Sequence, residues 1–183
     1  MLKQLSEKER GYIFGLFEGD GYKYHDKKSR HYHVEFYLNS IRDRAIIMNL
    51  ISLLKKAGLN PSEYLDKRYN CKRIRVYNKE FFEIISKKLD ISACSNEFNM
   101  GYVSGIIDSE GYVDSKRHYI VIVNTNRNML YLCKDFLSKI GINSSINQRK
   151  KGIKDTLNAY RMYISVKFKR LNHISIKVEI GKL

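Results

Sequence analysis

Hydrophobic and polar residues alternate along several short stretches of the chain, and stretches with helical spacing separate them. Between His31 and Asn39, Tyr32, Val34, Phe36 and Leu38 alternate with polar residues, which predicts a strand with one face toward a core. Residues 42–57 carry apolar side chains at helical spacing and are followed by Gly58, so we predict a helix that ends there. Further strands are predicted near 62–69 and 72–77, and a closing helix around 81–89.

The same order of elements restarts after residue 95. The periodicity predicts strands near 112–116 and 118–125, a helix over 127–140 ended by Gly141, strands over 143–149 and 159–166, and a last helix from about 168.

Each half therefore reads αββαββα, and the predicted fold class is α+β. We expect an N-terminal half at 1–90, a short linker at 91–96 and a C-terminal half at 97–183. The stretch from Leu89 to Asn96 lacks the glycine and proline of a flexible tether, so the halves should be held in a fixed relation. Asn39 of the first half is taken as the counterpart of Asn124 in the second.

The first predicted helix of each half carries a repeated segment. GYIFGLFEGDGY begins at Gly11, and GYVSGIIDSEGY begins at Gly101. Ser6 and Glu9 form a capping box that opens the first copy. The small residues of each copy recur at every fourth position, which is one face of a helix: Gly11, Gly15 and Gly19, then Gly101, Gly105 and Ser109.

Glycine inside a helix costs about 0.5–1 kcal/mol relative to alanine, so these repeated glycines require a compensating interaction. Close approach of two helix backbones supplies it, and we expect the two repeated helices to pack on each other at this face. Gly21 and Gly111 follow the helices, and we expect them to adopt the left-handed conformation that commonly ends a helix.

Asp20 and Glu110 are the last acids of the two helices. A carboxylate there faces the negative end of the helix dipole, so a positive group is expected beside it. If the helices run in parallel, the two acids meet, and two carboxylates in contact resist joint ionisation unless a cation lies between them. Oxygen ligands of this kind suit a hard ion such as Mg²⁺.

The repeated segments resemble the LAGLIDADG motif of homing endonucleases. Ile13 to Gly21 and Val103 to Gly111 align with its nine positions, and the resemblance extends over the whole chain. It implies a saddle of two antiparallel sheets over DNA, with the motif helices at the interface between the halves. The eighth position, which binds metal in that family, is Asp20 and Glu110, whereas the acids at the sixth position are Glu18 and Asp108.

The resemblance also implies site-specific, Mg²⁺-dependent hydrolysis of a long, asymmetric DNA target, with two or three divalent ions shared by the two acids. The backbone carbonyls of Gly19 and Ser109 would be further ligands. Polar and basic side chains around the centre would be Lys23, Asn39 and Asn124. Val113 stands where the first half has Lys23, so the two cleavage centres are expected to be unequal.

The charge balance agrees with a nucleic-acid partner. The 34 lysines and arginines exceed the 19 aspartates and glutamates, which gives a formal net charge of +15 spread along the chain. Side chains that bond phosphates and base edges are expected on the open strand faces. In the first half these are Lys23, His33, Tyr37, Tyr64, Arg68, Arg73 and Arg75, and in the second half His118, Asn147, Arg149 and Arg161.

Other classes of site have weaker support. Three cysteines without metal spacing indicate reduced thiols in an intracellular protein, in the cytoplasm or an organelle matrix. No apolar run approaches the length of a membrane span, so no membrane partner is expected. His25, His31 and His33 do not give three ligands of a zinc site, and we interpret them as surface or DNA-contacting residues.

The sequence therefore predicts a monomeric DNA endonuclease, and alternatives remain open. A group I intron splicing maturase, with intron RNA as a partner, or a transcription regulator could use the same fold without cleavage. Both eighth-position acids are present, which favours cleavage, although a maturase can keep them. A basic RNA-binding protein of another fold would leave the repeated helices unexplained.

Overall fold

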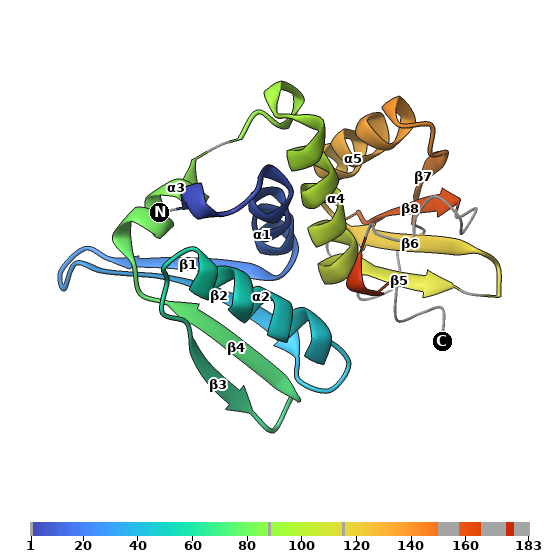
Figure 1. Ribbon diagram of the computed structural model, residues 1–183. Helices are drawn as coiled ribbons and strands as arrows, with labels where there is room; N and C mark the ends of the chain where they lie inside the picture. Colours follow the sequence, from blue (N-terminus) through green and yellow to red (C-terminus); the bar gives the residue numbers. More distant parts are fainter. Residues whose placement is uncertain (1, 88, 115, 150–157, 166–174, 178–183) are drawn as a thin grey trace.

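The protein consists of two similar halves that meet along a pair of helices (Figure 1). The computed structural model describes residues 2–87, 89–114, 116–149, 158–165 and 175–177. A four-stranded antiparallel sheet forms the base of each half, in the order β1-β2-β4-β3 in the first and β5-β6-β8-β7 in the second. The α+β class and the repeated αββαββ order are thus confirmed.

The element bounds follow the periodicity of the sequence closely. After a 3₁₀ turn at Leu2–Gln4, the first half contains α1 (Glu7–Asp20), β1 (Gly21–Asp26), β2 (His31–Asn39), α2 (Arg44–Lys56), β3 (Ser62–Asp66), β4 (Cys71–Val76) and α3 (Lys79–Ser86). A second 3₁₀ turn at Ile91–Ala93 leads into α4 (Asn96–Glu110), β5 (Gly111–Asp114), β6 (Tyr119–Asn124), α5 (Arg127–Lys139), β7 (Ser144–Gln148) and β8 (Tyr160–Ser165). The last helix predicted from about 168 lies outside the described residues, except for 175–177.

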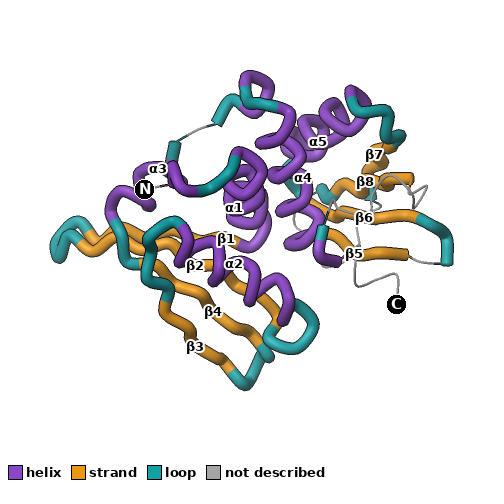
Figure 2. The backbone as a smooth tube through the Cα atoms, in the orientation of Figure 1, coloured by secondary structure: helices purple, strands orange, loops and turns teal. Residues whose placement is uncertain are grey.

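Helices α1 and α4 lie side by side at the centre of the molecule (Figure 2). They run in parallel, because a Cβ added to Gly11 would lie 2.8 Å from the carbonyl carbon of Phe98, and one added to Gly15 would lie 2.8 Å from that of Tyr102. Gly101 approaches Lys8 in the same way, so the contact is nearly the same when the two helices are exchanged. The glycine face therefore packs backbone against backbone, as predicted.

The glycines after the two helices differ from the expectation. Gly21 has φ −92° and Gly111 has φ −90°, so both are extended rather than left-handed. Space is the reason for glycine here: a Cβ on Gly21 would lie 2.6 Å from Cγ of Phe17, and one on Gly111 would lie 2.6 Å from the carbonyl oxygen of Ile107. In each half, the chain thus passes directly from the helix into a strand.

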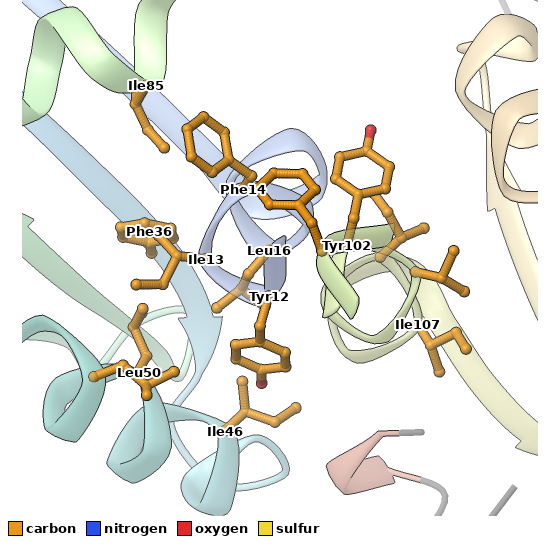
Figure 3. Packing of buried hydrophobic residues seen from close by; sticks show 14 of the residues in the cluster. Tyr12, Ile13, Phe14, Leu16, Phe36, Ile46, Leu50, Ile85, Tyr102 and Ile107 are labelled. Carbon is orange, nitrogen blue, oxygen red and sulfur yellow. The ribbon is translucent and has the colours of Figure 1, made fainter. Parts of the chain in front are cut away.

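The core of each half lies between its sheet and its helices. Ile13 and Leu16 of α1 face Phe36 of β2 and Leu50 of α2, and all four are fully buried (Figure 3). The capping box is present at the start of α1, where Ser6 N donates to Glu9 Oε2 at 2.8 Å and Glu9 N donates to Ser6 Oγ at 3.2 Å. Apolar burial and the cap together fix α1, whose last residue is Asp20.

Candidate metal centre and nucleic-acid interface

Asp20 and Glu110 are brought together at one end of the helix pair. Each is the last residue of its helix, and the parallel packing of α1 and α4 places these ends next to each other. A Cβ added to Gly19 would lie 3.0 Å from Cγ of Glu110 and 2.5 Å from Cβ of Ser109. The acids therefore belong to one site, to which each half contributes one carboxylate.

Both acids hold protons more tightly than they would in water. Burial, with added repulsion from Glu110 and Asp43, raises the pKa of Asp20 to about 7, while the charge of Lys177 acts in the opposite direction. Burial also raises the pKa of Glu110, while a hydrogen bond from Asn124 and the charge of Lys177 lower it. The site thus favours a bound cation, which would stabilise the ionised form of both acids.

The raised pKa of Asp20 predicts a pH-dependent loss of stability in the absence of metal. Between its ordinary value of 3.8 and about 7, the folded chain binds more protons at this group than the unfolded chain. The free energy of unfolding therefore falls as the pH rises through this window. Asp20→Asn removes that loss, so we expect it to stabilise the metal-free protein by about 1–3 kcal/mol at pH 8, with little effect below pH 4.

Thermal unfolding in EDTA at the two pH values measures this effect. Asp135→Asn, the same substitution at an exposed position of α5, is the matched control and should leave the stability unchanged. An Asp20→Asn protein that unfolds at a lower temperature than the parent at pH 8 would show that Asp20 is not under electrostatic strain.

A positive group lies beside the two acids, as the helix dipoles led us to expect. It is Lys177, whose Nζ donates to the carbonyl oxygens of Ser109 at 3.3 Å and Gly111 at 3.0 Å. Lys177 was not among the predicted site residues, because no motif or periodicity connects it to the repeated segments. In the sequence it is one of 34 lysines and arginines, and nothing there distinguishes it from the others.

The two asparagines expected near the centre are placed differently. Asn124 donates from Nδ2 to Glu110 Oε1 at 3.0 Å, so it contacts the acid of its own half. Asn39 instead accepts hydrogen bonds from the backbone N–H groups of Ile41 and Arg42. The strand pairing also shows that the two are not counterparts.

Gly21 lies opposite Phe36, and Gly111 lies opposite Ile122. Two residues farther along each strand come Leu38 in the first half and Asn124 in the second. The predicted equivalence of Asn39 and Asn124 is therefore wrong by one residue. Leu38 is buried, so the first half has an apolar side chain where the second half has Asn124.

Lys23 lies on the other face of its sheet from the remaining predicted contacts. It pairs with Val34, which is fully buried, whereas its neighbours Tyr22 and Tyr24 pair with Glu35 and His33 of the open face. Its exposed side chain lines a cleft of about 390 Å³ together with Glu18. Desolvation raises the pKa of Glu18, and the charge of Lys23 opposes part of that increase. The expectation that Lys23 shares the open face is wrong, because residues alternate between the faces of a strand.

The open face of the first sheet carries arginines that are held by aromatic and acidic neighbours. The guanidinium of Arg73 lies 4.4 Å from the ring centroid of Tyr64, a cation–π contact across β3 and β4. Arg75 is paired with Glu35, a carboxylate that is only 2 % exposed and also accepts from Tyr37 Oη at 2.6 Å.

Two other predicted contacts of this half lie nearby. His33 lies 5.2 Å from Tyr24 between ring centroids. Arg68 follows β3 in the hairpin to β4, where its Nη2 donates to Asp66 Oδ2 at 2.9 Å. Thus the open face of the first sheet presents basic and aromatic groups in fixed positions.

The second sheet is organised in the same way, and its described strands carry fewer cations than those of the first. Asn147 of β7 lies opposite Arg161 of β8, and both are exposed on the open face. His118 precedes β6 with φ 56°, and Arg149 follows β7, where its backbone N–H donates to Ala159 at 2.8 Å. All four residues predicted for this half therefore lie on β7, on β8 or at strand ends.

The other candidate ligands are accounted for separately. His25 stacks on Tyr32 with ring centroids 4.1 Å apart. Among the residues that the structure describes, no three side chains of His, Cys, Asp or Glu converge as metal ligands. The candidate centre thus relies on two carboxylates and neighbouring backbone oxygens. Within the same part of the chain, no helix has the length and apolar character needed to cross a membrane.

Comparison with known proteins agrees with this architecture. The model of the LAGLIDADG-like domain matches the chain twice, at residues 7–90 and 97–174. Two proteins of Methanocaldococcus jannaschii are similar in sequence. MJ0398 is 26 % identical over 169 residues, which are 90 % of this chain and 60 % of that protein. MJ0314 is 28 % identical over 150 residues, which are 74 % of this chain and 55 % of that protein. The chain spans little more than half the length of these relatives.

Solved structures share the fold at low sequence identity. The homing endonuclease I-DmoI in complex with DNA and Ca superposes with a TM-score of 0.72 at 19 % identity, over 96 % of this chain and 97 % of that one. Its complex with DNA and Mn gives a TM-score of 0.69 at 20 % identity, over 92 % and 96 % of the two chains. The N-terminal LAGLIDADG domain of DUF199/WhiA gives 0.57 at 18 % identity, over 87 % and 76 %.

Proposed function

Because the chain belongs to the family of LAGLIDADG-like domains, we propose that it is a site-specific DNA endonuclease that hydrolyses both strands of a long, asymmetric target. The observation that carries this proposal is the pairing of Asp20 and Glu110 at the ends of two helices packed backbone to backbone. A packing role alone would explain the glycines but not two half-buried acids at the same end of the helix pair. The fold is that of metal-dependent homing endonucleases, one of which was crystallised with DNA and Mn.

The donors present at the centre fit a hard divalent ion. Two carboxylates and the backbone carbonyls of Gly19 and Ser109 offer only oxygen, which is the ligand that Mg²⁺ prefers. We infer that these groups would hold two or three ions between the halves. When bound, Mg²⁺ would activate a water for attack on the phosphodiester and stabilise the departing 3′ oxygen.

The remaining residues of the centre position the acids. Asn124 holds Oε1 of Glu110, which fixes the direction of this carboxylate and leaves Oε2 to a ligand. Asp20 has the buried Leu38 in the corresponding place, and the charge of Asp43 repels it. The two strands of the target would thus meet unequal surroundings, and we expect them to be cut at different rates.

The open sheet faces provide the surface for the duplex. We propose that the two sheets form a saddle over the major groove, with His33, Tyr37, Tyr64, Arg68, Arg73 and Arg75 on one half-site and His118, Asn147, Arg149 and Arg161 on the other. The glycine face is satisfied within one chain, so we expect a monomer on DNA. Lys23 and Asn39 remain candidates for contacts near the cleaved phosphates.

The salt dependence and the arginines test this surface. The affinity for the target should fall with a log–log slope near −0.9 for each phosphate that the protein neutralises. Arg73→Lys and Arg161→Lys keep the charge but lose the planar fork, so each should relax the preference at particular base pairs by about 1–3 kcal/mol and leave the slope unchanged. Arg44→Lys on α2 is the control. An equal loss of affinity for all sequences would identify the arginine as a phosphate contact.

Selection from a DNA library tests the enzymatic function. The protein is incubated with random duplexes and Mg²⁺, and the ends of cleaved molecules are sequenced, with EDTA as the control. A recurring long site cut only in Mg²⁺ supports the endonuclease. Specific binding without cleavage would favour the alternative, a splicing maturase or a nucleic-acid-binding protein that uses the same fold, and intron RNA would then be the next ligand to test.

A further inference from the structure

Asp108, the acid two positions before Glu110, has its own set of partners. It is fully buried, and its Oδ2 accepts from Tyr12 Oη at 2.9 Å and from the backbone N–H of Ile176 at 3.1 Å. Its Oδ1 accepts from the backbone N–H of Lys177 at 2.9 Å. Asp108 therefore ties three parts of the chain together: α1, α4 and the segment at 175–177.

The counterpart of Asp108 in the first half behaves differently. Glu18 stands at the same motif position, but it is exposed and accepts from Asn126 Nδ2 at 3.3 Å. The attachment of a later segment through backbone N–H groups is thus a feature of the second motif. It makes the two sides of the centre unequal in a way that the repeated sequence does not reveal.

The tie at Asp108 determines where the ammonium group of Lys177 lies. Nζ donates to the carbonyl oxygens of Ser109 and Gly111, which belong to the end of α4 where helical carbonyls lack partners. A lysine at a helix end would need no further explanation. This one, however, also interacts electrostatically with both Asp20 and Glu110, one acid from each half.

We propose that Lys177 is a positioning residue of the metal centre that occupies the Ser109 carbonyl until a divalent ion displaces it, and so sets the affinity for that ion. This inference rests on the proposed function, in which the same carbonyl is a metal ligand. An ammonium group can satisfy the two acids in the absence of metal, but it repels a second cation that approaches them. Lys177 therefore competes with the divalent ion for the centre, and Asp108 holds Lys177 there through its backbone N–H.

Replacing the lysine while keeping its attachment separates these effects. Lys177→Met retains the backbone N–H that donates to Asp108, so the segment should stay in place while the charge is lost. The full DNA-free chain is titrated with Mn²⁺, and the free ion is followed by EPR. Because the competitor and its repulsion are removed, we expect Lys177→Met to bind Mn²⁺ about tenfold tighter than the parent or more.

Two further variants make the result specific to the centre. Lys139→Met makes the same change at the exposed last residue of α5. This helix begins at Arg127, three residues after Asn124, and Lys139 lies about 18 Å farther along it, so this variant should bind Mn²⁺ as the parent does. In the double variant Lys177→Met/Glu110→Gln, the gain in affinity should disappear, since one of the two acids is gone. Asp108→Asn weakens the attachment and should also raise the affinity, by less than Lys177→Met.

The outcomes distinguish this inference from the proposed function. Equal or weaker Mn²⁺ binding by Lys177→Met overturns the competition, whatever the cleavage assay shows. A gain in affinity that survives Glu110→Gln places the ion elsewhere and overturns it as well. The endonuclease itself is judged separately, by cleavage of the selected site by the parent protein.

Discussion

Asp20→Asn and Glu110→Gln are expected to reduce Mg²⁺-dependent cleavage by orders of magnitude while DNA binding persists. Each amide keeps the shape of the acid but loses the charge that holds the ion. Repulsion between the two acids and the phosphates also falls, so the affinity for the target should stay the same or increase. Ca²⁺ should support binding but little hydrolysis, because its larger and looser coordination shell positions the attacking water less well.

The assay follows nicked and linear products of the selected site beside a binding isotherm. Because Asn124 supports only Glu110, we expect the two variants to differ in which strand they still nick. Glu97→Gln and Asp135→Asn, at exposed positions of α4 and α5, are the controls and should cleave normally. Near-normal cleavage by either Asp20→Asn or Glu110→Gln would reduce the repeated motif to a packing device and remove the basis for an enzyme.

Gly15→Leu is expected to prevent folding. A Cβ at Gly15 would already lie 2.8 Å from the carbonyl carbon of Tyr102 and 3.0 Å from its Cα. These are backbone atoms of α4, which cannot change rotamer to make room as a side chain can. Overpacking of a well-packed core typically costs about 1–3 kcal/mol, and the cost is larger here because the two halves must separate to make room. A domain with about 5–15 kcal/mol of total stability would lose most of it.

Circular dichroism and thermal unfolding measure the effect. Gly15→Ala is a milder substitution and should lower the free energy of unfolding by about 1–3 kcal/mol. Ser52→Leu adds the same side chain at an exposed position of α2 and should remain folded. A soluble, cooperatively unfolding Gly15→Leu protein would contradict the packing of α1 on α4 as the centre of the fold.

Much of this architecture follows from local patterns in the sequence. Alternation along His31–Asn39 and helical spacing over 42–57 predicted the correct elements, with the helix observed at 44–56, because burial of one face requires that period. The glycine repeat predicted the helix pair, since only glycine allows two backbones to come so close. Because each acid is the last residue of its helix and the helices pack in parallel, the two acids lie at the same end of the pair.

The sequence could not place side chains that depend on strand register. The loop between β2 and α2 runs over residues 40–43, whereas only residues 125 and 126 separate β6 from α5. Because the loops differ in length, the alignment of Asn39 with Asn124 was shifted by one residue. A slip of one residue exchanges the two faces of a strand. Lys23 was misplaced for the related reason that its strand neighbours, Tyr22 and Tyr24, occupy the open face.

The repeated glycine face and the acid after it predict a packed helix pair whose acids meet if the helices run in parallel, with a cation beside them. The packing of Gly11 on Phe98 and of Gly15 on Tyr102 shows that they do run in parallel. The identity of this cation depends on the folded chain, because Lys177 lies 66 residues beyond the carbonyl of Gly111 that it contacts. The same is true of the contact of Asp108 with the backbone of 176 and 177, and of the ion pair between Glu35 and Arg75. Such contacts join segments far apart in the chain, and periodicity reports only on which face of an element is buried, not on what covers it.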